Sequence, residues 1–400
     1  MHIEFIQSVF KEKNMNSLKK SVLFVCYGLG IGGIEKCLVN LINAMPSEEF
    51  DIDILLMNPE YDLKNQIKRN VCFLDSFKYV MNTTDTYPEI KRRGGIIKNL
   101  NIFIRYLFFR ILNRYHKKSW ILFRNLKREY DYAVAYSQND FSPYFVIDKV
   151  SAKKKFLWYH NGTYEKNDAG FNIDKVYYNR FDKIVAVSND CRFMLQNKFH
   201  FDDNRVTVIH NIVNQNSILE LSNENNPFGN ELFTIVTVGR LTKEKGADLA
   251  VFVCKKLIDD GFKIKWHWVG DGNQFYTIRE LIEKNNLFDY FILEGNKINP
   301  YPYIKNADLY VQPSYYEAYS TTITEAKVLC KPIVTTDVGG MREQLTNGVN
   351  GFIVDISVNA IYKAILQIIK NNKIAQEFCF NLSNFDITNQ FEPYRLLFLS

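Results

Sequence analysis

The chain has 400 residues and a mass of 47.0 kDa, which at roughly 100–200 residues per domain predicts two domains. Hydrophobic residues make up 46% and charged residues 24%, a composition that excludes an intrinsically disordered chain. The net charge of +6 is local, because residues 86–130 hold 12 basic and 2 acidic side chains, a balance of +10 that leaves −4 elsewhere. This excludes a generally basic nucleic-acid coat protein, so we expect no nucleic-acid partner and one local anionic contact.

The N-terminus and the cysteines bear on the cellular compartment. Residues 1–19 precede the first predicted strand, and we expect a short N-terminal arm that lacks the apolar core of a signal peptide. No apolar run reaches the ~18 residues that a transmembrane helix needs. The 7 cysteines are scattered and form no C-x-x-C pair, which is typical of buried thiols in a reducing compartment. We therefore expect a cytoplasmic protein.

Short runs rich in Val, Ile and Phe alternate with helical patterns along the chain. The first series predicts strands at 21–28, 50–57, 130–137, 155–160, 183–188 and 205–211. The second series predicts strands at 233–240, 264–272, 290–295, 308–314, 331–336 and 351–355. Near-continuous apolar strands that alternate with helices are typical of parallel sheets covered by helices on both faces.

The two series predict an α/β protein with two doubly wound, Rossmann-like domains. The N-terminal domain covers residues 20–211 and the C-terminal domain residues 231–380, joined by a polar, Asn-rich linker over 212–230. Residues 381–400 are expected to form a C-terminal helix that packs back on the N-terminal domain. Ligands of doubly wound domains bind beyond the carboxyl ends of the strands, so the candidate site residues are those that follow predicted strands.

A glycine-rich turn, Gly28-Leu-Gly-Ile-Gly-Gly33, joins the first predicted strand to the first predicted helix. Backbone without Cβ atoms can approach a ligand closely, and a phosphate gains from the N–H groups and the dipole at a helix start. The spacing differs from the G-x-G-x-x-G dinucleotide fingerprint. A tight turn without a ligand is therefore an equally good interpretation of these glycines alone.

The basic segment contains a predicted amphipathic helix near residues 96–114. At 100° per residue its apolar side chains share one wide face, yet two aromatic rings fall among the cations on the opposite face. A core-facing helix with a solvated basic face is one interpretation. Rings among cations are better explained by an anionic membrane surface, where each cation contributes about 1 kcal/mol before screening. We predict peripheral association with the inner face of the cell membrane through Lys98, Arg105, Tyr106, Phe109 and Arg110.

Two cations, Arg240 and Lys245, follow the first strand of the second series. Placed five residues apart beyond one strand end, both can reach a single polyanion. Arg supplies a bidentate fork and Lys a point charge. A solvated surface pair is the alternative interpretation.

Two carboxylates, Glu317 and Glu325, flank three hydroxyl residues in a loop that enters a predicted helix. The first carboxylate is expected in the loop and the second about two helical turns later. Ser320, Thr321 and Thr322 can present backbone N–H groups at the helix start. The arrangement suits a sugar, a phosphate and a ribose bound in sequence.

In this order the motifs resemble the glycosyl transferases group 1, or family 4, which have the GT-B fold of two Rossmann-like domains facing a central cleft. The resemblance runs from about Lys20 to the C-terminus and is strongest over 238–354. The matching motifs are Gly-Gly-x-Glu at 32–35, Val-Gly-Arg…Lys-Gly at 238–246, Glu-x7-Glu at 317–325, Lys-Pro-Ile-Val at 331–334, Gly-Gly-x-x-Glu at 339–343 and Asn-Gly-x-x-Gly at 347–351. Departures are Glu317-Ala-Tyr-Ser320, where the family has Glu-Gly-Phe-Gly, and Asn211-Ile-Val-Asn214, where it has Asn-Gly-Val-Asp.

The resemblance implies a role for each matching residue. Arg240 and Lys245 would hold the diphosphate of a nucleotide sugar, and Glu325 the ribose hydroxyls. Glu317 and His160 would lie near the transferred sugar, so the implied catalytic residues are Glu317, His160, Arg240 and Lys245. The other implied donor contacts are Gly32, Gly33, Gly295, Asn296, Ser320, Thr321 and Thr322.

The resemblance implies a retaining glycosyltransferase that moves a hexose or N-acetylhexosamine from a nucleotide diphosphate sugar, with UDP expected. The implied acceptor is lipid-linked or a saccharide, in bacterial-type cell-surface polysaccharide assembly. Cations and N–H donors stabilise the leaving diphosphate, so we expect no cofactor and no metal site. The one Asp-x-Asp match, Asp51-Ile-Asp53, lies in an apolar strand run and is assigned to structure. A non-catalytic membrane-docking scaffold and a sugar-nucleotide epimerase of the same fold are the alternatives.

Overall fold

The computed structural model describes residues 19–58, 60–76, 111, 119–229, 232–385, 387 and 389–399. The residues predicted to contact a membrane, Lys98, Arg105, Tyr106, Phe109 and Arg110, all lie outside these ranges. Residues 1–18 of the expected N-terminal arm lie outside them as well. Both of these expectations therefore stay predictions. None of the helices in the described ranges is long and apolar enough to cross a membrane.

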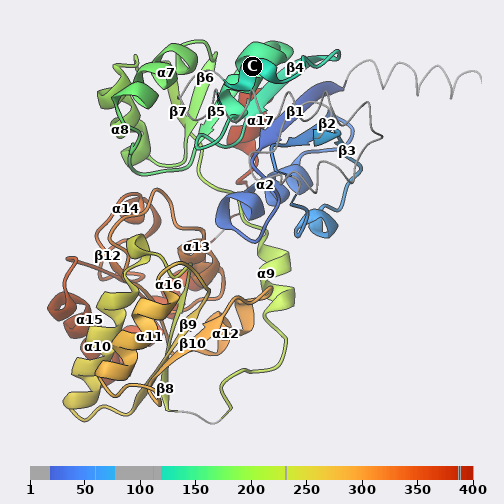
Figure 1. Ribbon diagram of the computed structural model, residues 1–400. Helices are drawn as coiled ribbons and strands as arrows, with labels where there is room; N and C mark the ends of the chain where they lie inside the picture. The colour runs from blue at the N-terminus through green and yellow to red at the C-terminus, as the bar shows by residue number, and fades with distance from the viewer. Residues whose placement is uncertain are drawn as a thin grey trace, which may run out of the picture.

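The N-terminal domain is built on a parallel sheet whose described strands run in the order β3-β2-β1-β4-β5-β6-β7 (Figure 1). Its strands are β1 (Lys20–Cys26), β2 (Phe50–Leu56), β3 (Cys72–Phe73), β4 (Glu129–Ala135), β5 (Ser151–Tyr159), β6 (Lys183–Ala186) and β7 (Val206–Val208). Its helices are α2 (Gly33–Ala44), α6 (Ser142–Lys149), α7 (Asp168–Tyr178) and α8 (Asn189–Phe199), with 3-10 turns at Lys64–Gln66 and Ser119–Leu122. The strand order reverses between β1 and β4, which is where a doubly wound sheet binds ligands.

The C-terminal domain repeats this plan with the order β10-β9-β8-β11-β12-β13. Its strands are β8 (Phe233–Val238), β9 (Ile264–Val269), β10 (Phe291–Gly295), β11 (Leu309–Gln312), β12 (Ile333–Thr336) and β13 (Phe352–Val354). Its helices are α10 (Ala247–Asp259), α11 (Phe275–Lys284), α12 (Tyr301–Asn306), α13 (Thr321–Val328), α14 (Met341–Gln344), α15 (Val358–Lys370) and α16 (Asn372–Ser383), with a 3-10 turn at Lys243–Lys245. The reversal here lies between β8 and β11. The predicted fold class of two doubly wound Rossmann-like domains is confirmed.

Each sheet has apolar side chains on both faces because its strands are nearly continuous apolar runs. The N-terminal sheet separates two buried clusters, one around Leu157 and one around Trp158, which are successive residues of β5. The side chains of successive strand residues point to opposite faces, so one strand feeds both cores. The C-terminal domain likewise has two buried clusters.

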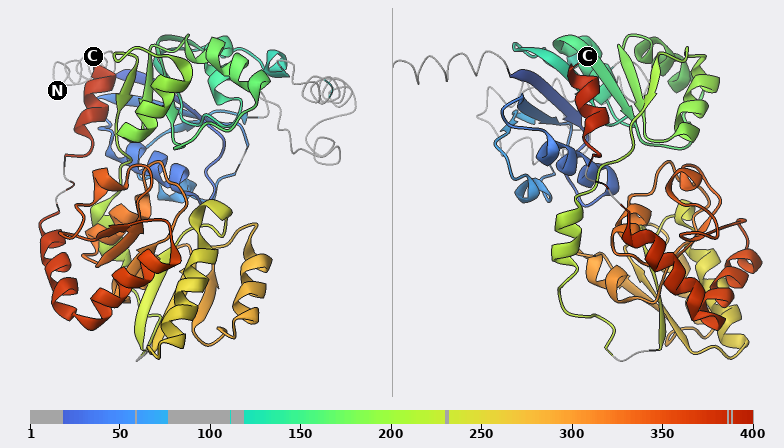
Figure 2. Two further views of the ribbon diagram at one scale, coloured as in Figure 1. Left: turned by 90° about the vertical axis from the view of Figure 1, so that its left-hand side faces the viewer. Right: turned by 180° about the vertical axis from the view of Figure 1, so that it is seen from behind.

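The C-terminal helix α17 (Glu392–Leu399) packs in the N-terminal domain, although it follows the C-terminal domain in the sequence (Figures 1 and 2). Tyr394 and Phe398 are buried in the same cluster as Phe24 of β1 and Trp158 of β5. The rings of Trp158 and Tyr394 stack with their centroids 5.9 Å apart. The chain therefore crosses between the two domains twice.

Two local features depart from the sequence reading. The linker contains a short helix, α9 (Gln215–Leu221), because the Asn214 side chain caps it by accepting a hydrogen bond from the Ser217 N–H at 3.0 Å. Strand β3 was not predicted, since two residues at a sheet edge carry no periodic signal.

The Asp51-Ile-Asp53 run lies in β2, as the structural assignment required. The carboxylate of Asp53 is 2% exposed and accepts hydrogen bonds from the Tyr130 hydroxyl at 2.6 Å and the Arg128 guanidinium at 3.0 Å. Asp51 pairs with the same guanidinium at 2.5 Å. These two carboxylates link β2 to the start of β4 at the amino ends of the strands, away from the carboxyl ends where ligands of such sheets bind.

Candidate active site

The carboxyl ends of the two sheets approach each other through the loops that follow their strands (Figure 1). A Cβ atom added at Gly33, the first residue of α2, would lie 3.5 Å from the Thr321 hydroxyl of α13. A Cβ atom added at Gly162, beyond β5, would lie 2.8 Å from the backbone oxygen of Glu317. The start of α2 and the loop after β5 in the N-terminal domain therefore lie next to the segment from Glu317 to Thr321 in the C-terminal domain.

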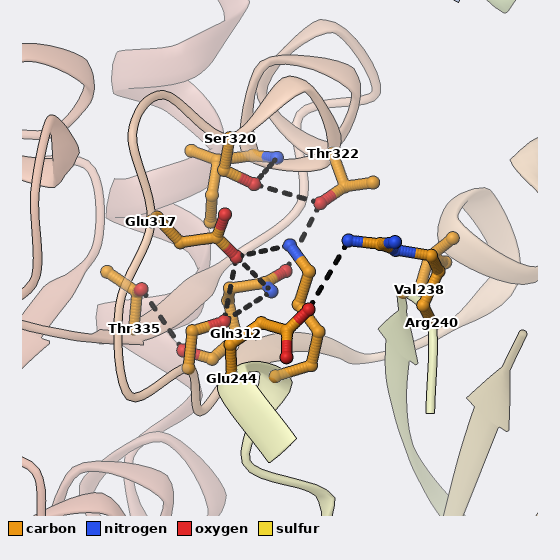
Figure 3. Close-up of polar contacts among 12 residues, drawn as sticks. Val238, Arg240, Glu244, Gln312, Glu317, Ser320, Thr322 and Thr335 are labelled. Atoms are coloured by element: carbon orange, nitrogen blue, oxygen red, sulfur yellow. Dashed lines mark hydrogen bonds and ion pairs between the residues drawn. The ribbon is translucent and has the colours of Figure 1, made fainter. Parts of the chain in front are cut away.

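Glu317 is the centre of a polar cluster at the end of β11 (Figure 3). Its Oε1 atom accepts hydrogen bonds from Lys245 Nζ at 2.6 Å, the Ser314 hydroxyl at 2.8 Å and Gln312 Nε2 at 3.1 Å. Gln312 and Ser314 are fully buried, so they hold the carboxylate in one orientation. The other carboxylate oxygen points away from these donors (Figure 3). The sequence identified Glu317 and Lys245 but not the two buried donors.

The two predicted cations are held very differently. The Lys245 side chain is 19% exposed and committed to Glu317, whereas that of Arg240 is 68% exposed. Arg240 makes one contact among the described residues, a pair with Glu244 at 3.3 Å (Figure 3). An exposed pair of this kind contributes only about 0–1 kcal/mol. Arg240 is therefore free to turn toward an incoming anion, while Lys245 is already fixed.

The hydroxyl residues at the start of α13 differ in whether they are already hydrogen-bonded within the C-terminal domain. Ser320 caps the helix, and its Oγ atom accepts from the Ile323 N–H at 3.4 Å. The Ser320 N–H itself donates to Gln344 Oε1 at 3.1 Å. The Thr322 hydroxyl donates to Gln312 Oε1 at 3.1 Å (Figure 3). Ser320 and Thr322 thus serve the helix and the Glu317 cluster, and Thr321 is the residue that faces the N-terminal domain.

Glu325, in the second turn of α13, is 4% exposed and accepts a hydrogen bond from the Tyr301 hydroxyl at 3.4 Å. Burial raises the pKa of its carboxyl group, against the opposing effects of Lys36 and of the Tyr301 hydrogen bond. Lys36 comes from α2 of the other domain, and its ammonium group lies 5.7 Å from the centroid of the Tyr301 ring. The sequence reading missed Lys36, although it directly follows the Gly-Gly-x-Glu motif.

The glycine-rich turn is surrounded by carboxylates of its own domain. A Cβ atom added at Gly32 would lie 2.1 Å from Glu35 Oε2, so the end of the Glu35 side chain lies against this glycine. Burial raises the pKa of Glu35, and Arg240 opposes the shift. The turn therefore places Glu35 of the N-terminal domain within electrostatic reach of the exposed Arg240 of the C-terminal domain.

His160 follows β5 and is 8% exposed. Its Nε2 atom lies 3.1 Å from the Tyr136 carbonyl oxygen, and burial lowers the imidazole pKa to about 4. The ring is therefore neutral near pH 7, with the proton on Nε2 and a lone pair on Nδ1. Within the described ranges Nδ1 has no hydrogen-bond partner.

Gly295 and Asn296 lie at the end of the edge strand β10, two strands away from β8. Gly295 has a φ of 68° and accepts a hydrogen bond from the Gly270 N–H at 2.9 Å. The structure thus places them on the carboxyl edge of the C-terminal sheet but not in the Glu317 cluster. Groups of three or more potential metal ligands are not found in the part of the chain that the structure describes.

The Gly-Gly-x-x-Glu motif has two structural roles that the sequence did not reveal. A Cβ atom added at Gly339, whose φ is 46°, would lie 1.7 Å from the Glu317 carbonyl oxygen, so this glycine lets the two loops pack closely. Glu343 accepts hydrogen bonds from the Asn189 backbone and side chain, both at 2.8 Å, and lies 3.0 Å from His210 Nε2. The His210 ring stacks on Tyr319 at 4.6 Å. We call these four residues, Glu343, Asn189, His210 and Tyr319, the interdomain clasp.

Two family models match consecutive halves of the chain. Residues 31–217 match the model described as Glycosyltransferase Family 4, and residues 220–381 match Glycosyl transferases group 1. The chain belongs to this glycosyltransferase family. Arg240, Lys245, Glu317 and Glu325 all fall within the second matched region.

Curated relatives are about a quarter identical to this chain over the stretches that align. An uncharacterised glycosyltransferase of Methanocaldococcus jannaschii is 28% identical over 218 residues, 51% of this chain and 53% of the relative. The 2-deoxystreptamine N-acetyl-D-glucosaminyltransferase of Niallia circulans is 26% identical, covering 52% and 56%. The poly(ribitol-phosphate) alpha-N-acetylglucosaminyltransferase of Staphylococcus aureus is 23% identical, covering 50% and 39%. The first two matches span about half the length of each relative.

A solved structure shows the same fold over nearly the whole chain. HepE of Anabaena, crystallised in complex with UDP, superposes with a TM-score of 0.70 at 15% identity and covers 94% of this chain and 99% of its own. The fold of this glycosyltransferase is therefore GT-B.

Proposed function

We propose that this glycosyltransferase is a hexosyltransferase that moves a hexose or N-acetylhexosamine from a UDP-sugar to a lipid-linked or saccharide acceptor. The observation that carries the proposal is the Lys245–Glu317 pair at 2.6 Å, oriented by Gln312 and Ser314 beyond β11. It joins a fixed cation and a fixed carboxylate at the point where the two domains meet. The UDP in the Anabaena neighbour and the names of the two N-acetylglucosaminyltransferase relatives support the choice of donor.

The chemistry follows from where charge develops. As the bond between the anomeric carbon and the diphosphate breaks, negative charge builds on the leaving oxygen and positive charge on the sugar ring. Lys245 and the mobile Arg240 stabilise the diphosphate, and the outward oxygen of Glu317 faces the sugar. We propose transfer with retention and without a metal, so turnover is expected to survive EDTA. The alpha linkage in the name of the S. aureus relative supports retention.

We also propose that the protein works at the inner face of the cell membrane in the assembly of a cell-surface polysaccharide. The support is the balance of +10 over residues 86–130 and the amphipathic pattern within it. Flotation with anionic and neutral vesicles at low salt measures this. Equal binding to both kinds of vesicle, or to neither, contradicts the membrane proposal without touching the donor site.

The donor site is tested by isothermal titration with UDP and GDP. We expect the wild type to prefer UDP and the double variant Arg240→Ala, Lys245→Ala to lose at least about tenfold in affinity, because charge-assisted contacts to phosphate are lost. Lys243→Ala is the matched control, an exposed cation in the same 3-10 turn. Equal binding by wild type and double variant would sink the assignment.

Release of UDP from UDP-N-acetylglucosamine separates an enzyme from a non-catalytic scaffold of the same fold. A transferase is expected to hydrolyse the donor slowly when water takes the place of the acceptor. A protein that binds UDP but never releases it from the sugar nucleotide would be a scaffold. Accumulation of an isomeric UDP-sugar would instead indicate an epimerase.

A further inference from the structure

Gln344, the last residue of α14, binds the backbone of Ser320 at the start of α13. Its Oε1 atom accepts the Ser320 N–H at 3.1 Å, and its Nε2 atom donates to the Ser320 carbonyl oxygen at 2.7 Å. Nε2 also donates to the Thr324 hydroxyl at 3.0 Å. Because a backbone N–H only donates and a carbonyl oxygen only accepts, the amide has a single orientation. One side chain therefore holds both polar groups of one backbone residue.

The contact between Gln344 and Ser320 is buried, and its base is fixed. Gln344 is 3% exposed and Ser320 is 4% exposed, so bulk water does not compete for these hydrogen bonds. The Gln344 backbone carbonyl accepts a hydrogen bond from Lys327 Nζ at 2.6 Å. The same ammonium group lies 3.7 Å from the centroid of the Phe385 ring. The amide therefore extends from a backbone that is itself held in place, as the support of a preformed site requires.

The segment that ends at Gln344 follows the Glu317 loop along its length. A Cβ atom added at Gly339 would lie 1.7 Å from the Glu317 carbonyl oxygen. The N–H of the next residue donates to the Ala318 carbonyl oxygen at 3.2 Å. The two hydrogen bonds from Gln344 to Ser320 complete the series. This segment thus supports the loop, and the Gln344 amide is its contact at the start of α13.

Ser320 connects two parts of the site. Its hydroxyl lies 3.0 Å from the Thr322 hydroxyl, which donates to Gln312 Oε1 at 3.1 Å (Figure 3). Gln312 Nε2 in turn donates to Glu317 Oε1 at 3.1 Å. Ser320 also caps α13, and the first N–H groups of a helix have no partners within it. A shift of the Ser320 backbone therefore displaces both the Glu317 carboxylate and the N–H donors at the start of α13.

We propose that Gln344 is a positioning residue of the transfer reaction. Its amide fixes the Ser320 backbone, and the Glu317 carboxylate and the first N–H groups of α13 thereby keep the orientation in which they face the donor. The inference rests on the proposed transferase function and adds a residue that acts on that site through Ser320.

The substitution Gln344→Met removes the amide and keeps a side chain of similar length. The buried Ser320 N–H then loses its acceptor, and its carbonyl keeps the longer bond from the Thr324 N–H at 3.5 Å. A buried donor without a partner is unfavourable, so the loop shifts to satisfy it. UDP affinity is shared with Arg240 and Glu325, whereas donors that face developing charge must be aligned in advance. The expected signature is a fall in kcat with little change in UDP affinity.

The test measures the release of UDP from saturating UDP-N-acetylglucosamine, with water as the acceptor. The rate is divided by the number of UDP-binding sites found by isothermal titration. This division removes any loss of folded protein, so a merely structural role would lower the melting temperature and the number of sites but not the rate per site. We expect Gln344→Met to lose at least about tenfold in rate per site and to bind UDP within about threefold of wild type.

Two further variants show whether the contact with Ser320 is what matters. Thr324→Val is the matched control, because it removes the third hydrogen bond of the Gln344 amide and leaves both bonds to Ser320. It should keep its rate per site within about twofold of wild type, since the loop stays supported. Gln344→Asn keeps an amide that is one methylene too short to reach both Ser320 groups, and it should lose rate per site as Gln344→Met does.

The outcomes separate this proposal from the proposed function. Wild-type rate per site in Gln344→Met or Gln344→Asn overturns the positioning role, whatever the melting temperature. An equal loss in Thr324→Val overturns it as well, because the bonds to Ser320 would then not be the cause. A tenfold or greater loss of UDP affinity in Gln344→Met would indicate a general disruption of the site and likewise overturn it. A wild type that binds UDP but never releases it from the sugar nucleotide refutes the transferase function, and the positioning role with it.

Discussion

The polar groups at the carboxyl ends of the two sheets differ in how fully they are hydrogen-bonded. Beyond β11 of the C-terminal domain, Glu317 Oε1 already receives hydrogen bonds from Lys245, Ser314 and Gln312. Beyond β4 and β5 of the N-terminal domain, Gln138 and His160 each keep a buried atom without a partner in the described part of the chain. The polar groups of the C-terminal domain are hydrogen-bonded to one another, whereas those of the N-terminal domain are only partly so.

This difference shows where the two domains place their binding energy. A fixed cation and carboxylate need no rearrangement when charge develops on the leaving diphosphate, which is the condition for strong electrostatic catalysis. The C-terminal side of the site is thus already organised by its own hydrogen bonds, whereas the N-terminal side keeps polar atoms that a ligand or water could still bind.

The largest expected effect comes from disturbing the complete edge at Gly339. In Gly339→Ala the new Cβ atom would lie 1.7 Å from the Glu317 carbonyl oxygen at a φ of 46°, so the Glu317 loop must move. A displacement of about 1 Å at a reacting group costs about 100-fold in rate, and we expect at least that loss of UDP-N-acetylglucosamine turnover.

Gly261→Ala is the matched control for this variant. Gly261 has a φ of 83° but nothing within 4 Å of an added Cβ atom, and it lies at the far end of α10. It should lose about 1 kcal/mol of stability through backbone strain and keep its turnover. Equal turnover by the two variants would show that the Glu317 loop does not need its support.

A smaller effect is expected from the link between the domains at Lys36. The Lys36 ammonium favours the ionised form of Glu325, whose pKa burial raises, so Lys36→Met should raise that pKa further. The carboxylate would then be protonated at a higher pH, and UDP affinity should fall by about tenfold near pH 6 and less near pH 8. Lys36→Arg is the control, since it keeps the charge. Titration with UDP at both pH values checks this, and a pH-independent loss would contradict the mechanism.

The smallest effect is expected from loosening the interdomain clasp. Glu343→Ala removes an acceptor that serves the Asn189 N–H, the Asn189 amide and His210. Because these groups are partly solvated, we expect about a fivefold rise in the KM for the donor with little change in kcat. Asp337→Ala, which breaks the exposed pair with Arg342, is the control and should leave KM unchanged. An unaltered KM in Glu343→Ala would show that the clasp does not hold the domains for donor binding.

The sequence predicted most of the fold because buried parallel strands appear as short, nearly continuous apolar runs. Strand β3 was missed because it has only two residues, and β5 was shortened because its start is polar: it begins at Ser151 rather than at 155, and Ala152 to Lys154 do not form an apolar run. The motifs identified Glu317 and Lys245 as residues of one site, but they did not predict the ion pair between them. The interdomain clasp and the Lys36–Tyr301 contact join residues that are far apart in the sequence, and no periodicity or spacing signals such pairs.

The position of α17 makes the two structural domains inseparable as pieces of chain. Helix α17 completes the core of the N-terminal domain. The Phe398 ring packs edge-on against Phe24 and Phe50 and stacks on Trp158. A fragment that stops at the linker would leave those aromatic rings facing water. Because the chain passes between the domains both after β7 and before α17, the C-terminal domain could be removed only by cutting the chain twice.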